Sequence, residues 1–367
     1  MKHTIKLASV IGLGVLLSAC GSDSDTQAPE ISKEVNADYT TVTGLDASSA
    51  FAYYDLDNNT QLTLTDEQAQ SNTQWDIAFK STNIIINGDY SGPGEVTAAF
   101  TGNNNDFRDA QGEPVVDKFT TATPEAELAD FLAVTEYAAD TEFYGDEFKT
   151  VFDSSFYDYN FTSHEVTAND DQYYLFQNAD GFYKVRAFSA SNLEGGVPGR
   201  GLTQFTIGYQ FKAADDQTFS AEQTVEIAQC DTQHYVDFSA NSEVLASDAW
   251  DITVLCDAFE VQLGEGASAY ALDGDETDER IATMMEFPQY YLTADFANTV
   301  FKHQFKWYEY NLAEGNQIWS QYGVYLVKTP VATYKLQVTS YYNLVEGVIT
   351  GRQISFIYDD VPQAVAQ

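Results

Sequence analysis

The sequence has few positively charged residues. Its 367 residues include 17 Lys and Arg against 56 Asp and Glu, so the formal net charge is −39 at pH 7. A surface of this sign repels phosphate groups, which excludes nucleic acid and anionic lipid headgroups as partners. The acidity itself is explained by a solvated surface that keeps the protein soluble in salty surroundings.

Histidine and catalytic motifs are also scarce. The chain has four His, and it contains no nucleophile elbow, no H-E-x-x-H motif, no phosphate-binding loop and no dinucleotide fingerprint. Few side chains are therefore available as general bases near neutral pH. We expect that the protein is not an enzyme.

Two acidic stretches resemble calcium-binding loops only in part. Residues 55–59 (DLDNN) begin like an EF-hand, but Thr60 stands where the sharp turn requires Gly. Residues 273–279 (DGDETDE) are a denser carboxylate cluster, for which a solvated loop is a better explanation than an ion site. Weak calcium binding at this second cluster stays an open alternative.

The chain has only three cysteines and no apolar run long enough to span a bilayer. Lys2 and Lys6 precede a short apolar segment, residues 8–17, which ends in Leu17-Ser18-Ala19-Cys20. A basic start, a short apolar segment and small residues before a cysteine are typical of a bacterial lipoprotein signal peptide. The pattern predicts a signal peptide over residues 1–19 and a lipid on Cys20.

The residues after the signal indicate how the protein is attached. Residues 20–38 are polar and acidic and lack periodic apolar positions, which predicts a flexible linker after the lipidated cysteine. Gly21, rather than aspartate, follows Cys20, and in enterobacteria this favours the outer membrane. We expect a protein on the cell outer membrane, attached through its lipid anchor only and either periplasmic or surface-exposed.

The other two cysteines are Cys230 and Cys256. Export places both outside the cytoplasm, where thiols are usually oxidised, and this predicts a Cys230–Cys256 disulfide. The chain has no CxxC motif and no Cys/His cluster with metal-ligand spacing, so a zinc or iron–sulfur site is not expected.

The sequence contains one pattern twice. Each copy starts from a short aromatic strand and ends on an alternating strand, with the same blocks between them in the same order. The blocks are WDIAF (75–79) and WDITV (250–254), FYDYN (156–160) and WYEYN (307–311), YYLFQNADGFYKVRAFSAS (173–191) and VYLVKTPVATYKLQVTSYY (324–342), and FTIGY (205–209) and ISFIY (354–358).

These blocks predict an all-β fold. They are rich in aromatic and β-branched residues, alternate with period two and are separated by turn signals such as Asn87-Gly88. We therefore expect two tandem domains of antiparallel β-sheet, over residues 39–212 and 213–367. One helix is expected at residues 124–132 (PEAELADFL), which has a proline at its start, acidic residues in its first turn and helical apolar spacing.

The two copies resemble a known family. The string WDIAFKSTNIIINGDYSGPG (75–94), followed by FYDYN, SHEV and DGFYKV, resembles the HmuY-type haem-binding lipoproteins of Gram-negative bacteria. The second copy is similar in its WDI, WYEYN and TYKLQVTSYY blocks, although LGEGASA (263–269) stands where the first copy has the NGDYSGPG turn. The resemblance implies two tandem HmuY-like β domains. It also implies binding of haem or a related porphyrin for iron acquisition and delivery to a TonB-dependent outer-membrane receptor.

The resemblance also suggests ligands for the haem iron. His164, in the string TSHEV, stands where the family has a T-H-x-V ligand, and no histidine occurs at the matching place in the second copy. For a ligand in the loop about thirty residues upstream, the second copy offers Met284 and Met285, and the first offers Tyr137 or Tyr144. Imidazole and thioether groups are normal axial ligands of haem iron.

A second interpretation keeps the fold without the haem. In that case the chain is a non-catalytic surface module for adhesion or for docking a partner, and His164 is an exposed histidine at the end of a strand. The two interpretations differ in whether a complete set of iron ligands comes together.

The lipoprotein prediction has a direct test. Cys20→Ser removes the thiol that carries the lipid, so we expect this variant to lose fatty-acid labelling and membrane attachment completely. The measurement is metabolic labelling with a fatty-acid analogue, beside the unchanged chain. A labelled Cys20→Ser protein would contradict the prediction.

Overall fold

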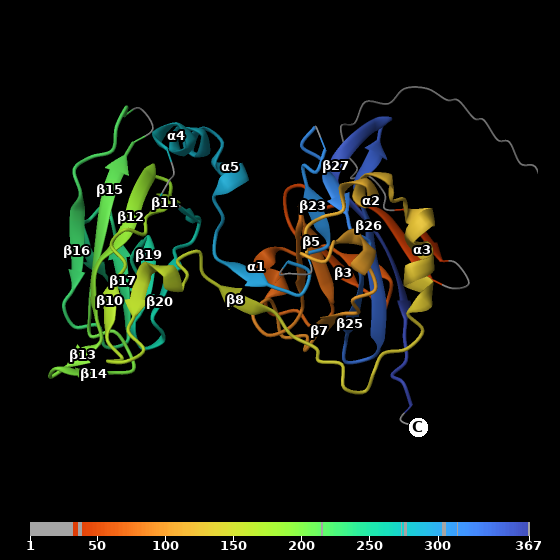
Figure 1. Ribbon diagram of the computed structural model, residues 1–367, viewed down its shortest axis with the longest axis horizontal. Helices are drawn as coiled ribbons and strands as arrows, with labels where there is room; N and C mark the ends of the chain where they lie inside the picture. The colour runs from red at the N-terminus through yellow and green to blue at the C-terminus, as the bar shows by residue number, and fades with distance from the viewer. Residues whose placement is uncertain are drawn as a thin grey trace, which may run out of the picture.

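The computed structural model describes residues 32–35, 39–213, 216–272, 274, 277–302, 306–313 and 315–365, and Cys20 lies outside these ranges. It confirms the all-β prediction, because antiparallel sheets with a few short helices make up the described chain. None of the helices in these ranges is long and apolar enough to cross a membrane. The strands form two bodies, each with its own hydrophobic core (Figure 1).

Body 1 consists of the described residues within 32–146 and 299–365 and holds two packed sheets. Alternating apolar residues face inward from both sheets, so that the rings of Phe79 and Phe356 stack at 5.1 Å between them. The six-stranded sheet has the order β1 (Ser32–Val35), β2 (Thr40–Asp46), β27 (Val348–Asp360), β26 (Thr333–Val345), β25 (Val324–Lys328) and β7 (Thr97–Phe100). The four-stranded sheet has the order β4 (Thr60–Leu62), β3 (Ala52–Asp55), β5 (Ile77–Lys80) and β6 (Asn83–Ile86).

Body 2 consists of the described residues within 150–295 and repeats this arrangement. Phe176 and Tyr183 of the larger sheet contact Phe238, which follows a strand of the smaller sheet. Their ring centres lie 5.5 and 5.3 Å from the centre of the Phe238 ring. The five-stranded sheet has the order β16 (Gln223–Ile227), β15 (Gln204–Lys212), β12 (Phe182–Ser191), β11 (Tyr174–Gln177) and β21 (Ser268–Ala271). The four-stranded sheet has the order β18 (Ser242–Val244), β17 (Gln233–Asp237), β19 (Ile252–Leu255) and β20 (Glu260–Leu263).

Short strand pairs complete the fold. One pair runs between the bodies, where β8 (Glu147–Lys149) and β22 (Phe296–Asn298) pair antiparallel. The others are β9 (Tyr157–Tyr159) with β10 (Val166–Ala168) and β13 (Leu193–Glu194) with β14 (Val197–Pro198) in body 2, and β23 (Tyr308–Tyr310) with β24 (Ile318–Ser320) in body 1.

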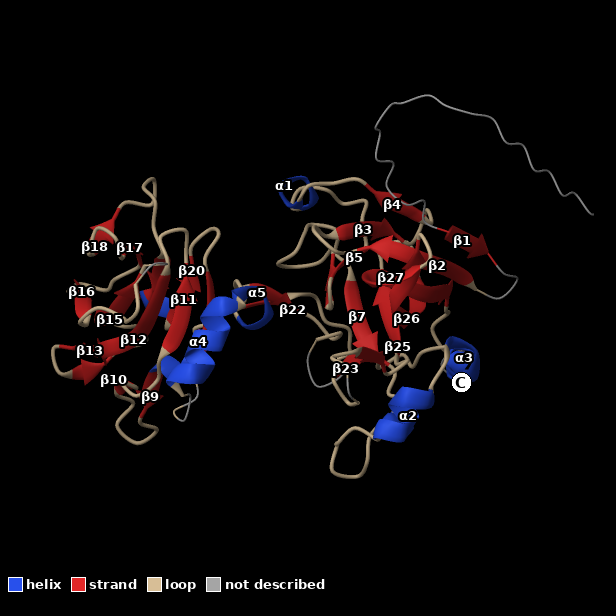
Figure 2. Ribbon diagram, turned by 90° about the horizontal axis from the view of Figure 1, so that it is seen from above, coloured by secondary structure: helices blue, strands red, loops and turns tan. Residues whose placement is uncertain are grey.

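The predicted helix is α3 (Pro124–Ala133), and the Thr123 side chain caps its N-terminus by accepting from the Ala126 amide. The other α-helices are α1 (Asp66–Ala69), α2 (Val116–Thr121), α4 (Asp278–Glu286) and α5 (Pro288–Tyr291), and single 3-10 turns lie at Asn105–Phe107, Ser154–Phe156 and Cys256–Ala258. Figure 2 shows the helices around the margins of the two sheet bodies.

The two bodies exchange halves of the sequence repeat. In the large sheets, β16, β15, β12, β11 and β21 occupy the places of β2, β27, β26, β25 and β7. The first half of repeat 1 (β2–β7) therefore pairs with the second half of repeat 2 (β25–β27). The second half of repeat 1 pairs with the first half of repeat 2.

The predicted division at residues 212 and 213 describes the sequence repeat, but the folded units do not follow it. Phe100 of β7 pairs with Tyr325 of β25, and Tyr174 of β11 pairs with Ala271 of β21. Because the two copies present similar strands, either copy can complete the sheet of the other. Similar sequence alone does not tell which of the two strands becomes the partner.

The WDI motif has the same task in both bodies. The Asp76 carboxylate accepts the amide of Leu56 at 2.7 Å, and the Asp251 carboxylate accepts the amide of Phe238 at 2.7 Å. In each case the donor follows the short aromatic strand of the same repeat. The motif therefore fixes the end of that strand against the next one.

The side chain of Asn87 explains why the NGDYSGPG turn contains glycines. The buried Asn87 side chain donates to the carbonyl of Trp75 at 2.6 Å and accepts the amide of Gly94 at 2.9 Å. A Cβ atom on Gly92 would lie 2.1 Å from the Asn87 Oδ1 atom, so only glycine fits there. At the matching place in body 2, Gly264 has no side chain, and its backbone donates to the Asp251 carbonyl and accepts the Ala267 amide.

The exchange predicts that the two repeats cannot be separated by one cut. A specific protease site inserted between Gln217 and Thr218, which are exposed, would divide the chain at the junction of the repeats. The strand pairing predicts that both fragments elute together at the intact size under native conditions. The Cys230–Cys256 disulfide cannot link them covalently, because both cysteines lie in one fragment.

The measurement is size-exclusion chromatography with and without denaturant. The uncut chain carrying the same insertion is the control. Two half-sized peaks without denaturant would mean that each repeat folds on its own.

Candidate functional site

The candidate site is a groove beside α4 in body 2. Thr277 caps this helix by accepting the Arg280 amide, and its apolar residues Ile281 and Met284 are buried against Leu175 of β11. Met285 is the next residue along, so it lies on a different side of the helix. Its side chain is half-buried and lines the groove.

The groove is a cavity of about 680 Å³, and a second recess of about 590 Å³ shares Lys184 and Ile281 with it. Both volumes lie in the range of small-molecule sites. The lining of the groove comes from β12, β15, the segment after β15, and α4. The main lining residues are Phe182, Lys184, Lys212, Phe219, Ile281 and Met285.

The groove combines apolar side chains with two lysines and three acidic residues, Asp216, Asp278 and Glu286. The Lys184 Nζ atom lies 5.0 Å from the centre of the Phe219 ring, and the Lys212 ammonium donates to the Asp216 carbonyl. Two lysines at one cavity are notable in a chain with only 17 Lys and Arg. The apolar wall and the two lysines offer contacts to a flat apolar ligand that carries carboxylates.

Body 1 fills the corresponding space. Lys335 of β26 matches Lys184 of β12, but Lys335 is buried beneath α3. Its Nζ atom donates to the Val134 carbonyl at 2.9 Å and lies 4.6 Å from the centre of the Phe131 ring. Phe131 itself is fully buried, so its ring occupies space beneath α3 that is open beside Lys184 in body 2.

The structure places His164 on the β9–β10 hairpin of body 2. Its φ angle is 62°, and its exposed ring lies with Nδ1 2.6 Å from the Tyr159 hydroxyl. The His164 carbonyl accepts from Asn192 at 2.9 Å, which holds the turn in place. His164 does not line the groove beside α4.

Tyr137 and Tyr144 lie in body 1, apart from the other three predicted ligands. The Tyr137 hydroxyl lies 3.3 Å from that of Thr333, in a smaller cavity of about 380 Å³. Tyr144 is exposed, and its hydrogen bond to the Glu142 carboxylate raises its pKa. A raised pKa disfavours the tyrosinate that iron binds. Met284 is fully buried in the core beneath α4.

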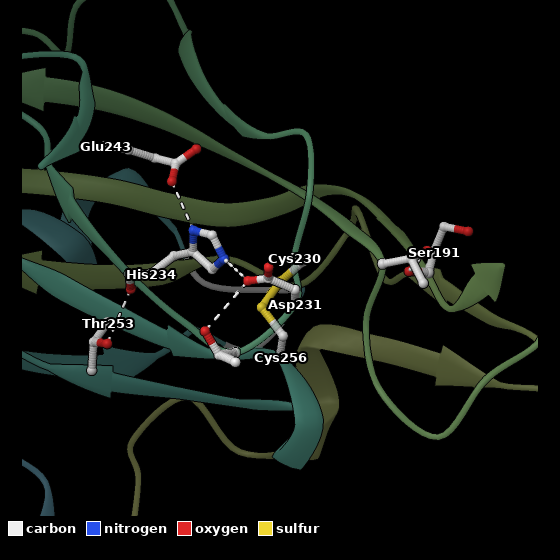
Figure 3. Close-up of a disulfide and its surroundings, with 9 residues drawn as sticks. Ser191, Cys230, Asp231, His234, Glu243, Thr253 and Cys256 are labelled. Carbon is white, nitrogen blue, oxygen red and sulfur yellow. Dashed lines mark hydrogen bonds and ion pairs between the residues drawn. A yellow bond between two sulfur atoms is a disulfide. The ribbon is translucent and has the colours of Figure 1, made fainter.

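Cys230 and Cys256 form a disulfide, with the Cα atoms 5.5 Å apart (Figure 3). It joins the segment before β17 to the end of β19. Beside it, the His234 Nδ1 atom lies 2.7 Å from a Glu243 carboxylate oxygen, which gives this histidine a structural partner. The predicted lipidation residue Cys20 lies outside the described residues.

Three carboxylates meet at the end of β3. Oxygens of Asp55, Asp57 and Asp76 all lie within 4.8 Å of one another. Residues 55–59 alone do not show this cluster, because Asp76 comes from the WDI motif further along the chain. Each carboxylate already accepts protein donors. Asp55 accepts the Asn58 amide at 2.8 Å, Asp57 accepts the Tyr334 hydroxyl at 2.8 Å, and Asp76 accepts the Leu56 amide.

The lysines and Phe219 of the groove were not predicted from the sequence. The sequence marks Lys184 only by its recurrence as Lys335 in the second repeat. This recurrence does not indicate which of the two lysines belongs to a binding site. Phe219 and Lys212 belong to the junction of the repeats, where no motif occurs. They become part of a site only through the exchange.

Comparisons with known proteins support the family resemblance in part. Residues 47–201 match the family model described as HmuY protein. The matched segment starts just before β3 in body 1 and ends after β14 in body 2, so the HmuY match crosses from one body to the other. The second repeat lies outside it.

One solved structure is a "putative lipoprotein" from Bacteroides fragilis. It is 13% identical and covers 42% of this chain and 88% of its own, with a TM-score of 0.15. That score is too low for the match to support a fold or a function. No curated protein matches the sequence.

The acidic cluster generates a prediction about pH. Burial, followed by the neighbouring Asp57 and Asp55 charges, raises the pKa of Asp76 from 3.8 to about 7. Between pH 4 and 7 the folded protein therefore holds a proton that the unfolded chain has lost. The contribution of the protonated Asp76 to the free energy of unfolding therefore falls as pH rises through this window.

Asp76→Asn removes this titration but keeps an acceptor for the Leu56 amide. Relative to the parent, the variant should gain on the order of 2 kcal/mol in free energy of unfolding between pH 4 and 7. Urea unfolding across this pH range measures the gain. Glu67→Gln, at an exposed carboxylate on α1, is the control and should show no comparable trend. A pH-independent difference for Asp76→Asn would contradict the prediction.

Proposed function

We propose that this chain is a lipid-anchored surface protein that binds haem, or a related porphyrin, in the groove beside α4. The HmuY match over residues 47–201 supports a binding protein rather than an enzyme. The observation that carries the proposal is the Met285 side chain at a cavity with aromatic walls and two lysines.

The groove residues fit the chemistry of such a ligand. A porphyrin ring is flat and apolar, which suits Phe182, Phe219 and Ile281. Its carboxylates suit the ammonium groups of Lys184 and Lys212. A bound haem would supply an iron centre, and the thioether of Met285 would be the groove residue that holds it.

His164 lies on the β9–β10 hairpin, outside the groove, so it is the candidate ligand of an alternative site in the same body as Met285. The remaining predicted ligands are less favoured. Met284 is a core residue, and Tyr137 and Tyr144 belong to body 1. On this proposal the protein takes up haem for iron acquisition and passes it to a TonB-dependent receptor at the outer membrane.

Two neighbouring methionines provide the test. Met285→Leu removes the thioether from the groove, and Met284→Leu makes the same change in the core as a matched control. We expect Met285→Leu to weaken haemin binding about tenfold, the effect of losing roughly 1.4 kcal/mol. It should also remove any near-infrared sulfur-to-iron band, whereas Met284→Leu should leave spectrum and affinity unchanged.

The measurement is haemin titration followed by the Soret band, with His164→Ala in parallel. If Met285→Leu behaves as the parent while His164→Ala does not, the haem lies at the β9–β10 hairpin and the groove assignment is wrong. If the parent itself shows no saturable Soret shift, the chain is a surface module for adhesion or partner docking without haem.

A further inference from the structure

The β26–β27 hairpin of body 1 ends in an exposed apolar tip. Leu344 is 65%, Val348 is 64% and Ile349 is 74% exposed. Leu344 pairs with Ile349 and Val345 pairs with Val348, so neighbouring pairs point to opposite faces of the hairpin. Both faces of the tip are therefore apolar; Val345 is half-buried and the other three side chains are exposed.

The tip also differs from the rest of the chain in charge. Residues 341–352 contain one acidic residue, Glu346, and one basic residue, Arg352, in a chain with a net charge of −39. Tyr341 and Tyr342 lie half-buried at the base of the tip. An apolar end above a band of tyrosines is the composition found at the interface between lipid and water.

The chain leaves body 1 beside this tip. Ser32, the first residue of β1, pairs with Thr43 of β2, and the next residue, Gly44, lies against the Asn343 side chain. Because β1 runs antiparallel to β2, the direction from Val35 back to Ser32 points towards the tip end of the sheet. Figure 1 shows the β26–β27 hairpin at the upper end of body 1, opposite the C-terminus.

The predicted anchor lies within reach of the tip. The twelve residues from Cys20 to Ile31 span at most about 40 Å when fully extended. A lipid on Cys20 therefore keeps the tip within a few nanometres of the bilayer. Contact of an apolar tip with the bilayer adds a second attachment to a single lipid anchor.

We propose that residues 344–349 insert into the interface of a zwitterionic phospholipid bilayer. The orientation of body 1 rests on the proposed lipid anchor, whereas the affinity of the tip for lipid does not. Zwitterionic lipid is the expected surface because the charge of the whole chain repels anionic headgroups.

The test separates the tip from the anchor. The mature chain starting at residue 21, which has no lipidated cysteine, is floated with phosphatidylcholine vesicles in a density gradient. We expect a measurable bound fraction for this chain. Leu344→Ser/Ile349→Ser should lower its partition coefficient at least about tenfold.

The matched control uses the corresponding hairpin of body 2. Leu193 and Val197 of β13–β14 are also exposed, but Figure 1 shows that hairpin at the opposite end. Leu193→Ser/Val197→Ser should bind vesicles as the parent does. Equal loss in both double variants would mean that any exposed apolar residue drives binding, and would overturn the proposal.

Two further outcomes would also overturn it. One is a parent chain that stays at the bottom of the gradient. The other is a change in oligomeric state on Leu344→Ser/Ile349→Ser, measured by analytical ultracentrifugation, without vesicle binding by the parent, since the tip would then contact a second copy of the chain. Fatty-acid labelling of Cys20 is a separate measurement, so failure of the anchor and failure of the tip are distinguishable.

Discussion

Hydrogen bonds between strands of different repeats hold this protein together. In body 1, β25, β26 and β27 come from the end of the chain. They are flanked by β2 on one side and β7 on the other, and both of these come from the start of the chain. In body 2, β11 and β15 of the first repeat are bordered by β21 and β16 of the second. A four-residue strand such as β7 is not stable alone, so each half depends on its partner. The groove depends on the same pairing, because Met285 comes from the second repeat and Lys184 from the first.

The exchange gives two similar bodies, and small differences open a groove beside the helix of body 2. Phe131 and Met284 both lie on the helix that covers the large sheet. In body 1 the phenyl ring and the buried Lys335 fill the space beneath α3. In body 2 the lysine opens to a cavity beside α4. Residues between β7 and β8 also cover body 1, where Phe107 and Phe119 pack against Tyr322.

Much of this architecture could be predicted from local pattern. The strands follow from alternating apolar residues, α3 from its proline start and apolar spacing, and the repeat from its matched blocks. The exchange could not be predicted, because β25 and β11 are similar enough that sequence gives no preference between them as a partner for β7. The groove and the Asp55–Asp57–Asp76 cluster were missed for a related reason. Their members come from separate segments, and only the folded backbone brings them together.

The exchange has a consequence in time. Residues 150–295 are contiguous, so body 2 can complete both of its sheets as soon as this stretch has been synthesised and is free to fold. The first hundred residues of body 1 must wait for β25, whose pairing with β7 joins Tyr325 to Phe100. Contacts so distant along the chain form slowly, because a long loop must close before they contribute. During this interval the edges of β2 and β7 remain unpaired, and this is the stage at which the chain is most exposed to aggregation and proteolysis.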